Sequence, residues 1–227
     1  MSAHIIQAKN ISKHFTLGGQ RIQILNDISL SVVVGEFVVV AGRSGSGKST
    51  LLSVLSGLDK PDGGRVELCS VDITPLSEDQ LAPIRNESIG FVFQSFHLIP
   101  SLSAIENIQF PAELKKDKMA KEKAQDLLDK VGLGHRAGNF PSQMSGGEQQ
   151  RVAICRALIN EPKIVFADEP TGNLDSENSE GIIELLYTLH AELNTTLVIA
   201  THSHSLAARA ERIIRLRDGV IEEGRGM

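Results

Sequence analysis

The stretch GRSGSGKST, from Gly42 to Thr50, has the residue types and spacing of a phosphate-binding loop. It matches the pattern G-x-x-x-x-G-K-[ST] and lies between an apolar run, EFVVVA, and a predicted helix, KSTLLSVLSGL. In such a loop the backbone N–H groups curl around the phosphates, Lys48 reaches the β and γ oxygens, and the Ser49 hydroxyl can bind Mg²⁺. A flexible Gly/Ser turn is the alternative, but the strand–loop–helix setting favours a nucleoside triphosphate site. Its predicted residues are Gly42, Ser44, Gly45, Ser46, Gly47, Lys48, Ser49 and Thr50.

A second stretch, MSGGEQQR from Met144 to Arg151, also has the character of a phosphate cradle. Ser145, Gly146 and Gly147 stand at the start of a predicted helix, where free backbone N–H groups and the positive end of the helix dipole favour an anion. The spacing alone does not explain why one chain carries two such cradles.

Adjacent acids end the apolar run KIVFADE, from Lys163 to Glu169. Acids at the end of a strand can be solvated caps, but beside a phosphate-binding loop this arrangement is typical of a strand that presents an aspartate toward Mg²⁺. We predict that Asp168 orients the metal through its water and that Glu169 is the general base for an attacking water.

Two polar residues follow other predicted strands. Gln94 comes after SIGFVF, where an amide can contact both Mg²⁺ and the lytic water, although an ordinary polar strand cap is the alternative. His202 ends TLVIAT, where a neutral imidazole can bond to the γ-phosphate, although a lone histidine is usually structural. His202 and His204 also have a spacing that zinc can use, but no further ligands lie close in sequence.

Phe15 lies in ISKHFTLGG, ahead of the first long predicted strand. Aromatic residues make up only 4% of this chain, so the position of each one is informative. A core phenylalanine is one interpretation; a flat platform for adenine is the other.

These residues need a scaffold, and the hydrophobic pattern predicts an α/β sheet with crossover helices. Several strand-sized runs are apolar without alternation, as expected of strands that are covered on both faces. The predicted strands are 22–34 (broken near Asp27), 36–41, 65–68, 88–93, 163–167, 196–201 and 212–216. The predicted helices are 48–57, 105–114, 119–131, 146–159 and 177–193.

The spacing of these elements is uneven, because no convincing strand lies between Phe93 and Lys163. We interpret residues 1–227 as a single domain with a helical lobe inserted at about 95–160. Pro100 borders the lobe on one side, and Asn139 and Pro141 border it on the other.

Composition narrows the function classes. The net charge of −5 and the lack of a dense Lys/Arg block argue against a nucleic-acid partner. No apolar run approaches the roughly 18 residues that a membrane span needs. The N-terminal sequence lacks a basic start and an apolar core, so we do not expect secretion. The 2 cysteines, Cys69 and Cys155, follow no paired spacing and are expected to be core residues.

In this order the motifs resemble those of the ATP-binding cassette (ABC) ATPases, over nearly the whole chain. GRSGSGKST resembles the Walker A motif, FVFQ the Q-loop and MSGGEQQR the ABC signature. VFADEP resembles Walker B, TGNLD the D-loop and ATH the switch histidine. The resemblance implies a P-loop NTPase fold of ABC ATPase type, with an antiparallel β subdomain and an inserted α-helical subdomain.

The resemblance also implies an explanation for the second cradle. Members of the family form a head-to-tail homodimer that encloses two ATP molecules, each between the P-loop of one copy and the signature helix of the other. Ser145, Gly146 and Gly147 would then serve the nucleotide of the partner copy, with ATP and Mg²⁺ as cofactors.

Finer wording, such as GFVFQSFHLIPSLSAIENI, resembles the lipoprotein-release and macrolide-export branch of the family. This implies an ATPase on the cytoplasmic, inner face of the cell membrane that powers permease subunits and exports or extracts lipoprotein, lipid or amphipathic cargo. A groove for the permease is expected at Phe96, Leu98, Ile99 and Pro100, unless these residues belong to the core of the lobe. The alternative function is an ATPase of the cell-division type, whose permease partner moves no cargo.

Overall fold

The computed structural model describes residues 3–222, apart from the side chains of Glu177 and His204. The chain forms two compact units. Unit 1 combines the residues up to Arg85 with those from Thr196 onward, and unit 2 runs from Asn86 to Thr195. The chain passes from unit 1 to unit 2 within α2 (Glu78–Ser88).

Unit 1 contains a four-stranded antiparallel sheet, with the strands in the order β2-β1-β4-β5. The strands are β1 (His4–Leu17), β2 (Gln20–Val33), β4 (Gly63–Leu68) and β5 (Val71–Asp72). The predicted strands at 22–34 and 65–68 are confirmed as β2 and β4. The sequence did not reveal β1, because shifts in its register against β2 interrupt the alternation of buried and exposed residues that marks a strand.

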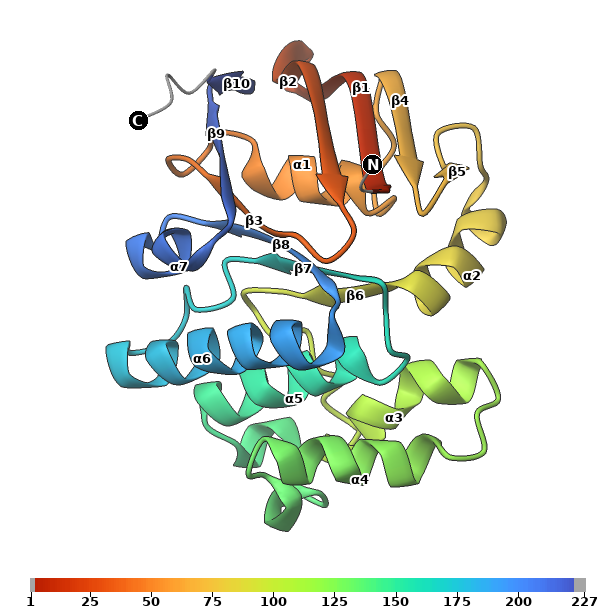
Figure 1. Cartoon of the computed structure of the whole chain (residues 1–227), viewed down its shortest axis with the longest axis vertical. Helices are drawn as coiled ribbons and strands as arrows, with labels where there is room; N and C mark the ends of the chain where they lie inside the picture. Colours follow the sequence, from red (N-terminus) through yellow and green to blue (C-terminus); the bar gives the residue numbers. More distant parts are fainter. Residues whose placement is uncertain (1–2, 223–227) are drawn as a thin grey trace. The chain divides into compact units, whose positions relative to one another are not determined.

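The second group of strands in unit 1 has the order β10-β9-β3-β8. The strands are β3 (Phe37–Ala41), β8 (Thr196–Thr201), β9 (Arg212–Arg217) and β10 (Val220–Glu222). β3 pairs in parallel with both β8 and β9, and its residues are buried up to Val40, as predicted from an apolar run without alternation. Helix α1 (Lys48–Leu55) contacts β2 and β4 of one sheet and β8 of the other (Figure 1).

Unit 2 contains the parallel strands β6 (Ile89–Val92) and β7 (Ile164–Asp168), with no strand between them. The chain between them forms helices, as predicted, and α6 follows β7. The helices are α3 (Ala104–Leu114), α4 (Ala120–Lys130), α5 (Gly146–Leu158) and α6 (Ser176–Leu193), with short 3₁₀ turns at Gly134–Arg136 and Pro141–Gln143. The prediction that Ser88 begins a strand was wrong, since this residue ends α2 and the strand begins at Ile89. The inserted helical lobe predicted at about 95–160 is shorter than unit 2, and these bounds stay a prediction.

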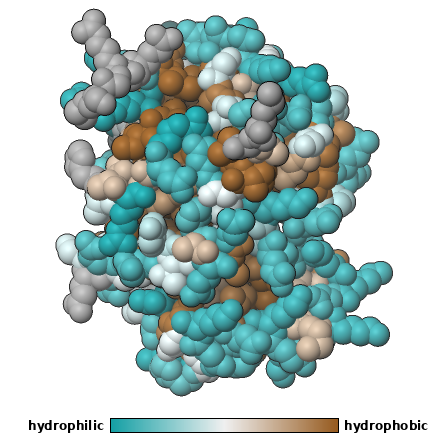
Figure 2. Space-filling model, viewed as in Figure 1, coloured by the Kyte–Doolittle hydropathy of each residue, from teal (hydrophilic) through white to brown (hydrophobic). Residues whose placement is uncertain are grey.

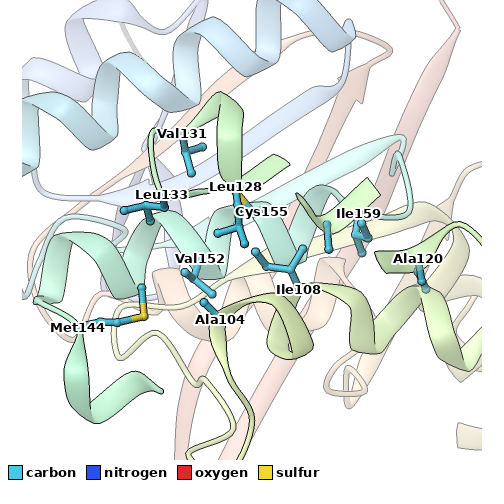
Figure 3. Packing of buried hydrophobic residues seen from close by; sticks show 12 residues of the cluster. Ala104, Ile108, Ala120, Leu128, Val131, Leu133, Met144, Val152, Cys155 and Ile159 are labelled. Carbon is cyan, nitrogen blue, oxygen red and sulfur yellow. The ribbon is translucent and has the colours of Figure 1, made fainter. Parts of the chain in front are cut away.

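Helices α3, α4 and α5 pack against one another around an apolar cluster (Figure 3). Ile108, Leu128 and Val152 are fully buried in it, and burying such side chains contributes about 1.5–3 kcal/mol each. Cys155 is buried in the same cluster, so it is a core residue, as the sequence predicts. This burial raises the pKa of its thiol to about 12. On the face drawn in Figure 2 the helices of unit 2 carry mostly hydrophilic residues, with smaller hydrophobic patches between them.

Candidate nucleotide site

The loop from Gly42 to Thr50 joins strand β3 to helix α1, as the motif requires. Gly45 and Gly47 have φ angles of +80° and +101°, in the left-handed region that favours glycine. A Cβ at Gly47 would lie 2.9 Å from the backbone oxygen of Ile24, so this position accepts no side chain without a shift of the backbone. The loop is therefore shaped by its own glycines.

Lys48 begins α1 and lies folded back over the loop. Its Nζ donates to the carbonyl oxygen of Gly42 at 3.0 Å and to that of Arg43 at 3.2 Å, and the residue is only 6% exposed. The loop carbonyls therefore hold a buried ammonium against the loop itself. The contact of Lys48 with the β and γ oxygens of a nucleotide stays a prediction.

Two further features of the loop fit a triphosphate. Ser46 Oγ is buried and has no hydrogen-bond partner among residues 3–222, which is unusual for a hydroxyl unless a ligand or water completes the site. Helix α1 begins after Gly47, which has no side chain to cap the first amides of the helix. The positive end of the helix dipole favours a bound anion at this end of α1.

Helix α5, at the second cradle, begins with a different arrangement. Ser145 is its N-cap, and it forms a capping box with Glu148. The backbone N–H of Ser145 donates to Glu148 Oε2 at 2.7 Å, while Ser145 Oγ accepts from the Glu148 N–H at 3.3 Å. That backbone donor, together with Ser145 Oγ and the nearby Arg136, lowers the pKa of the Glu148 carboxyl. The cap is therefore kept at neutral pH and is lost only as pH falls through this lowered pKa.

The glycines of the second cradle allow close packing within unit 2. A Cβ at Gly147 would lie 2.6 Å from Asn178 Oδ1, in the first turns of α6. A Cβ at Gly146 would lie 3.3 Å from Leu174 and 3.6 Å from the ring of Phe96. The start of α5 therefore lies against the segment that follows β7 and against the segment that follows β6.

Strand β7 carries the predicted carboxylates at its end. Residues Ile164 to Ala167 are buried, whereas Asp168 and Glu169 are half-buried. Glu169 has a φ angle of 44°, a left-handed conformation that is uncommon for a residue with a side chain. The Gly172 N–H donates to the Glu169 carbonyl at 3.0 Å and closes a turn around it. Backbone strain of this kind gathers at functional sites. The role of Glu169 as general base stays a prediction.

Gln94 follows β6 and lies against the same turn. Its amide Nε2 donates to Asn173 Oδ1 at 3.2 Å, and Asn173 Nδ2 donates to the Gln94 carbonyl at 3.0 Å. Unit 2 therefore holds Gln94 close to the segment that carries Glu169.

The remaining predicted residues lie in unit 1. His202 is exposed and follows β8; after it, Ser203 caps α7 (His204–Arg209). Phe15 is 47% exposed on β1, with Lys13 Nζ 5.5 Å from its ring centroid. This exposure excludes the interpretation of Phe15 as a core residue, and the adenine platform stays a prediction.

The segment expected to meet a permease is held by two side chains that the sequence analysis missed. Arg156 on α5 donates to the carbonyl oxygens of Phe96 and His97 at 2.8 and 2.6 Å. Asn107 on α3 is fully buried, accepts from the Ile99 N–H and donates to the carbonyls of Ile99, Leu102 and Ser103. Of the four residues expected in the groove, Pro100 is exposed, and Phe96, Leu98 and Ile99 are half-buried, with Leu98 packed against the apolar cluster.

We expect Arg156→Met to loosen this segment, because Phe96 and His97 both have left-handed φ angles, of 59° and 50°, that the guanidinium stabilises. Losing two hydrogen bonds from a charged donor should lower the free energy of unfolding by about 1–3 kcal/mol. Urea unfolding measures this loss, and hydrogen exchange should speed up at residues 96–99. Lys121→Met, an exposed change on α4, is the control. Unchanged exchange at residues 96–99 would contradict the assigned role of Arg156.

Neither a protein-ligated metal cluster nor a membrane span is found in the part of the chain that the structure describes. No three histidine, cysteine, aspartate or glutamate side chains gather there as potential ligands, and the His204 side chain considered for zinc lies outside the described residues. No helix within residues 3–222 combines the length and apolar character needed to cross a bilayer.

Comparison with known proteins identifies the family. Residues 25–172 match the family model described as ABC transporter. The chain belongs to the ABC transporter family. In agreement with this, it superposes with a TM-score of 0.89 on the ATP-binding cassette MJ0796, solved as a dimer in a post-hydrolysis state with ADP and Pi. The two chains are 42% identical, and the match covers 98% of this chain and 100% of the other.

Curated relatives match over nearly the whole of this chain. The lipoprotein-releasing system ATP-binding protein LolD of Idiomarina loihiensis is 44% identical over 100% of both chains. The macrolide export ATP-binding/permease protein MacB of Syntrophobacter fumaroxidans is 46% identical over 98% of this chain, which spans only 32% of that protein. As a family member, the chain is an ATP-binding and ATP-hydrolysing subunit of a transporter, and these relatives favour that role over the cell-division alternative.

Proposed function

We propose that the predicted site residues act on ATP, and that the loop at Lys48 carries its triphosphate. The observation that supports this most strongly is the loop itself: a buried lysine folded over two carbonyls, a buried hydroxyl without a partner in the described residues, and an uncapped helix start. Phe15 stacks on the adenine, and Thr50 contacts the α-phosphate.

In the proposed hydrolysis, Glu169 accepts a proton from the attacking water. The water oxygen forms a bond to the γ-phosphorus, the bond from that phosphorus to the β–γ bridging oxygen breaks, and the ADP leaving group takes the electron pair. Lys48 and His202 stabilise the negative charge that develops on the γ-phosphate oxygens. The left-handed backbone conformation at Glu169 sets the direction in which its side chain leaves the backbone.

Ser49, Gln94 and Asp168 are the proposed holders of Mg²⁺. A hydroxyl, an amide oxygen and a carboxylate are hard oxygen donors, which is the ligand chemistry that Mg²⁺ prefers. When bound, the cation neutralises charge on the β- and γ-phosphate oxygens. Ser49 lies at the start of α1, whereas Gln94 and Asp168 follow β6 and end β7.

We further propose that two copies of the chain pair head to tail. Ser145, Gly146 and Gly147 of one copy then contact the γ-phosphate of the ATP that the other copy holds. The difference between the two helix starts supports this. Helix α1 has no side-chain cap, which suits the binding of the nucleotide by its own chain. Helix α5 is capped by Ser145, so its first turn is stable without a nucleotide. ATP joins the copies, and hydrolysis releases them.

The proposed partner of this dimer is an integral-membrane permease, and the proposed location is the cytoplasmic, inner face of the cell membrane. The names of the LolD and MacB relatives support a lipoprotein or another amphipathic molecule as the cargo. No nucleic-acid partner is proposed, in keeping with the net charge of −5.

Reconstitution tests this proposal. The chain and a permease that co-purifies with it would be placed in proteoliposomes that carry a fluorescent lipoprotein, with Glu169→Gln as the control. We expect ATP-dependent release of the lipoprotein by the unmodified chain only. Stimulated ATP hydrolysis without release of the lipoprotein would instead indicate a complex that does not move this cargo.

A further inference from the structure

Gln94 and Asn173 form two hydrogen bonds with each other, which the proposed metal role of Gln94 does not by itself explain. The two residues lie 79 positions apart in the sequence and contact each other at two points. One contact uses the side chain of Gln94 and the other its backbone carbonyl. Asn173 thus holds Gln94 by its backbone and by its side chain together.

The chemistry of these contacts fixes the orientation of both amides. A backbone carbonyl oxygen only accepts, so the Asn173 atom 3.0 Å from the Gln94 carbonyl is the donor Nδ2. The other Asn173 atom is then the acceptor Oδ1, and the Gln94 atom 3.2 Å from it is the donor Nε2. By elimination, the Gln94 side chain turns its nitrogen toward Asn173 and keeps its oxygen Oε1 for another ligand.

Gly172 provides the space for this arrangement. A Cβ at position 172 would lie 2.7 Å from Gln94 Nε2 and 3.0 Å from its Cδ. The Gln94 amide therefore lies over the bare backbone of Gly172, whose N–H donates to the carbonyl of Glu169. The glycine and the asparagine act on the same amide from adjacent positions.

From this geometry we infer that Asn173 is a positioning residue for Gln94, which it holds with Oε1 turned toward the metal. The inference rests on the proposed function of Gln94 as a Mg²⁺ ligand. If the Gln94 amide were turned the other way, it would present its N–H groups to the metal, and N–H groups cannot bind a cation. A Gln94 side chain without this partner would have to be ordered when the metal binds, at a cost in conformational entropy.

Binding of the non-hydrolysable analogue AMP-PNP, measured by calorimetry with and without Mg²⁺, tests the inference without turnover. Asn173→Ala should weaken the gain in affinity that Mg²⁺ provides by about 3- to 10-fold, the effect of losing the one hydrogen bond that holds the Gln94 side chain. Binding without Mg²⁺ should not change. Gly172→Ala should act in the same direction, because the new methyl displaces the end of the Gln94 side chain. Gln125→Ala, which removes an amide contact to Asp129 on α4, is the matched control.

A double variant separates a positioning role from a merely structural one. If Asn173 acts through Gln94, then Asn173→Ala should have no further effect on the Mg²⁺ gain in a Gln94→Ala background. Additive losses would overturn the inference, as would an unchanged Mg²⁺ gain in Asn173→Ala when Gln94→Ala reduces it. If Gln94→Ala itself left the Mg²⁺ gain intact, the proposed metal role of Gln94 would fail, and the inference with it.

Discussion

Replacing Glu169 with glutamine is expected to abolish ATP turnover while leaving the nucleotide bound. Glutamine has the same shape but cannot accept a proton from the attacking water, and the loss of a general base costs about 10²- to 10⁴-fold in rate. Because hydrolysis no longer releases the two copies, the variant should elute as a dimer in gel filtration with Mg²⁺ and ATP, and as a monomer without ATP. Phosphate release measures the rate.

The control for this variant is Glu161→Gln, an exposed acid close before β7, which should hydrolyse ATP at the rate of the unmodified chain. Normal turnover in Glu169→Gln would remove Glu169 from the role of base. Slow turnover without a dimer would leave the base assignment intact but contradict the account of how ATP joins two copies.

The second large effect is expected at Ser145. Ser145→Arg should prevent formation of the ATP-dependent dimer, because its long side chain occupies the space that the partner's γ-phosphate needs. The loss of the cap on α5 costs about 1 kcal/mol, which is too little to unfold the chain. ATP binding to the separate copies should stay within about twofold, a free-energy change below 0.5 kcal/mol. Analytical ultracentrifugation and calorimetry measure the two properties.

Two further variants make this result specific. Ser145→Asp keeps a good N-cap but places a negative charge where a phosphate is expected, so it should also remain monomeric. Ser142→Arg, at an exposed residue of the 3₁₀ turn before α5, should dimerise normally. If Ser145→Arg instead destroyed ATP binding by the isolated copy, Ser145 would belong to the nucleotide site of its own chain.

The sequence predicted the elements of the site better than the contacts between its residues. Apolar runs without alternation located β3, β7 and β8, because strands covered on both faces need no polar positions. Strand β1 was missed because its consecutive buried residues Ile5 and Ile6 and its shifts in register hide the period of two. Helix α2 was missed because it is polar and contains Pro83.

The residues that hold the site in place were not predictable in the same way. Motif spacing identifies Gln94 and Glu169 because the chemistry needs those residue types at the ends of strands. Asn173, Arg156 and Asn107 act through backbone carbonyls of segments that are distant in sequence or bent back on themselves. Such contacts depend on the path of the loop, which no residue pattern records. Of these three residues, only Asn107 had a signal in the sequence, because it is a polar residue on an otherwise apolar helix face.

The rate of hydrolysis at decreasing protein concentration tests the shared site most directly. If each ATP needs a P-loop from one copy and the Ser145 cradle from another, the rate per copy at saturating Mg²⁺ and ATP should fall in proportion to concentration once the copies are mostly separate. A rate per copy that stays constant down to protein concentrations at which sedimentation shows single chains would contradict the account.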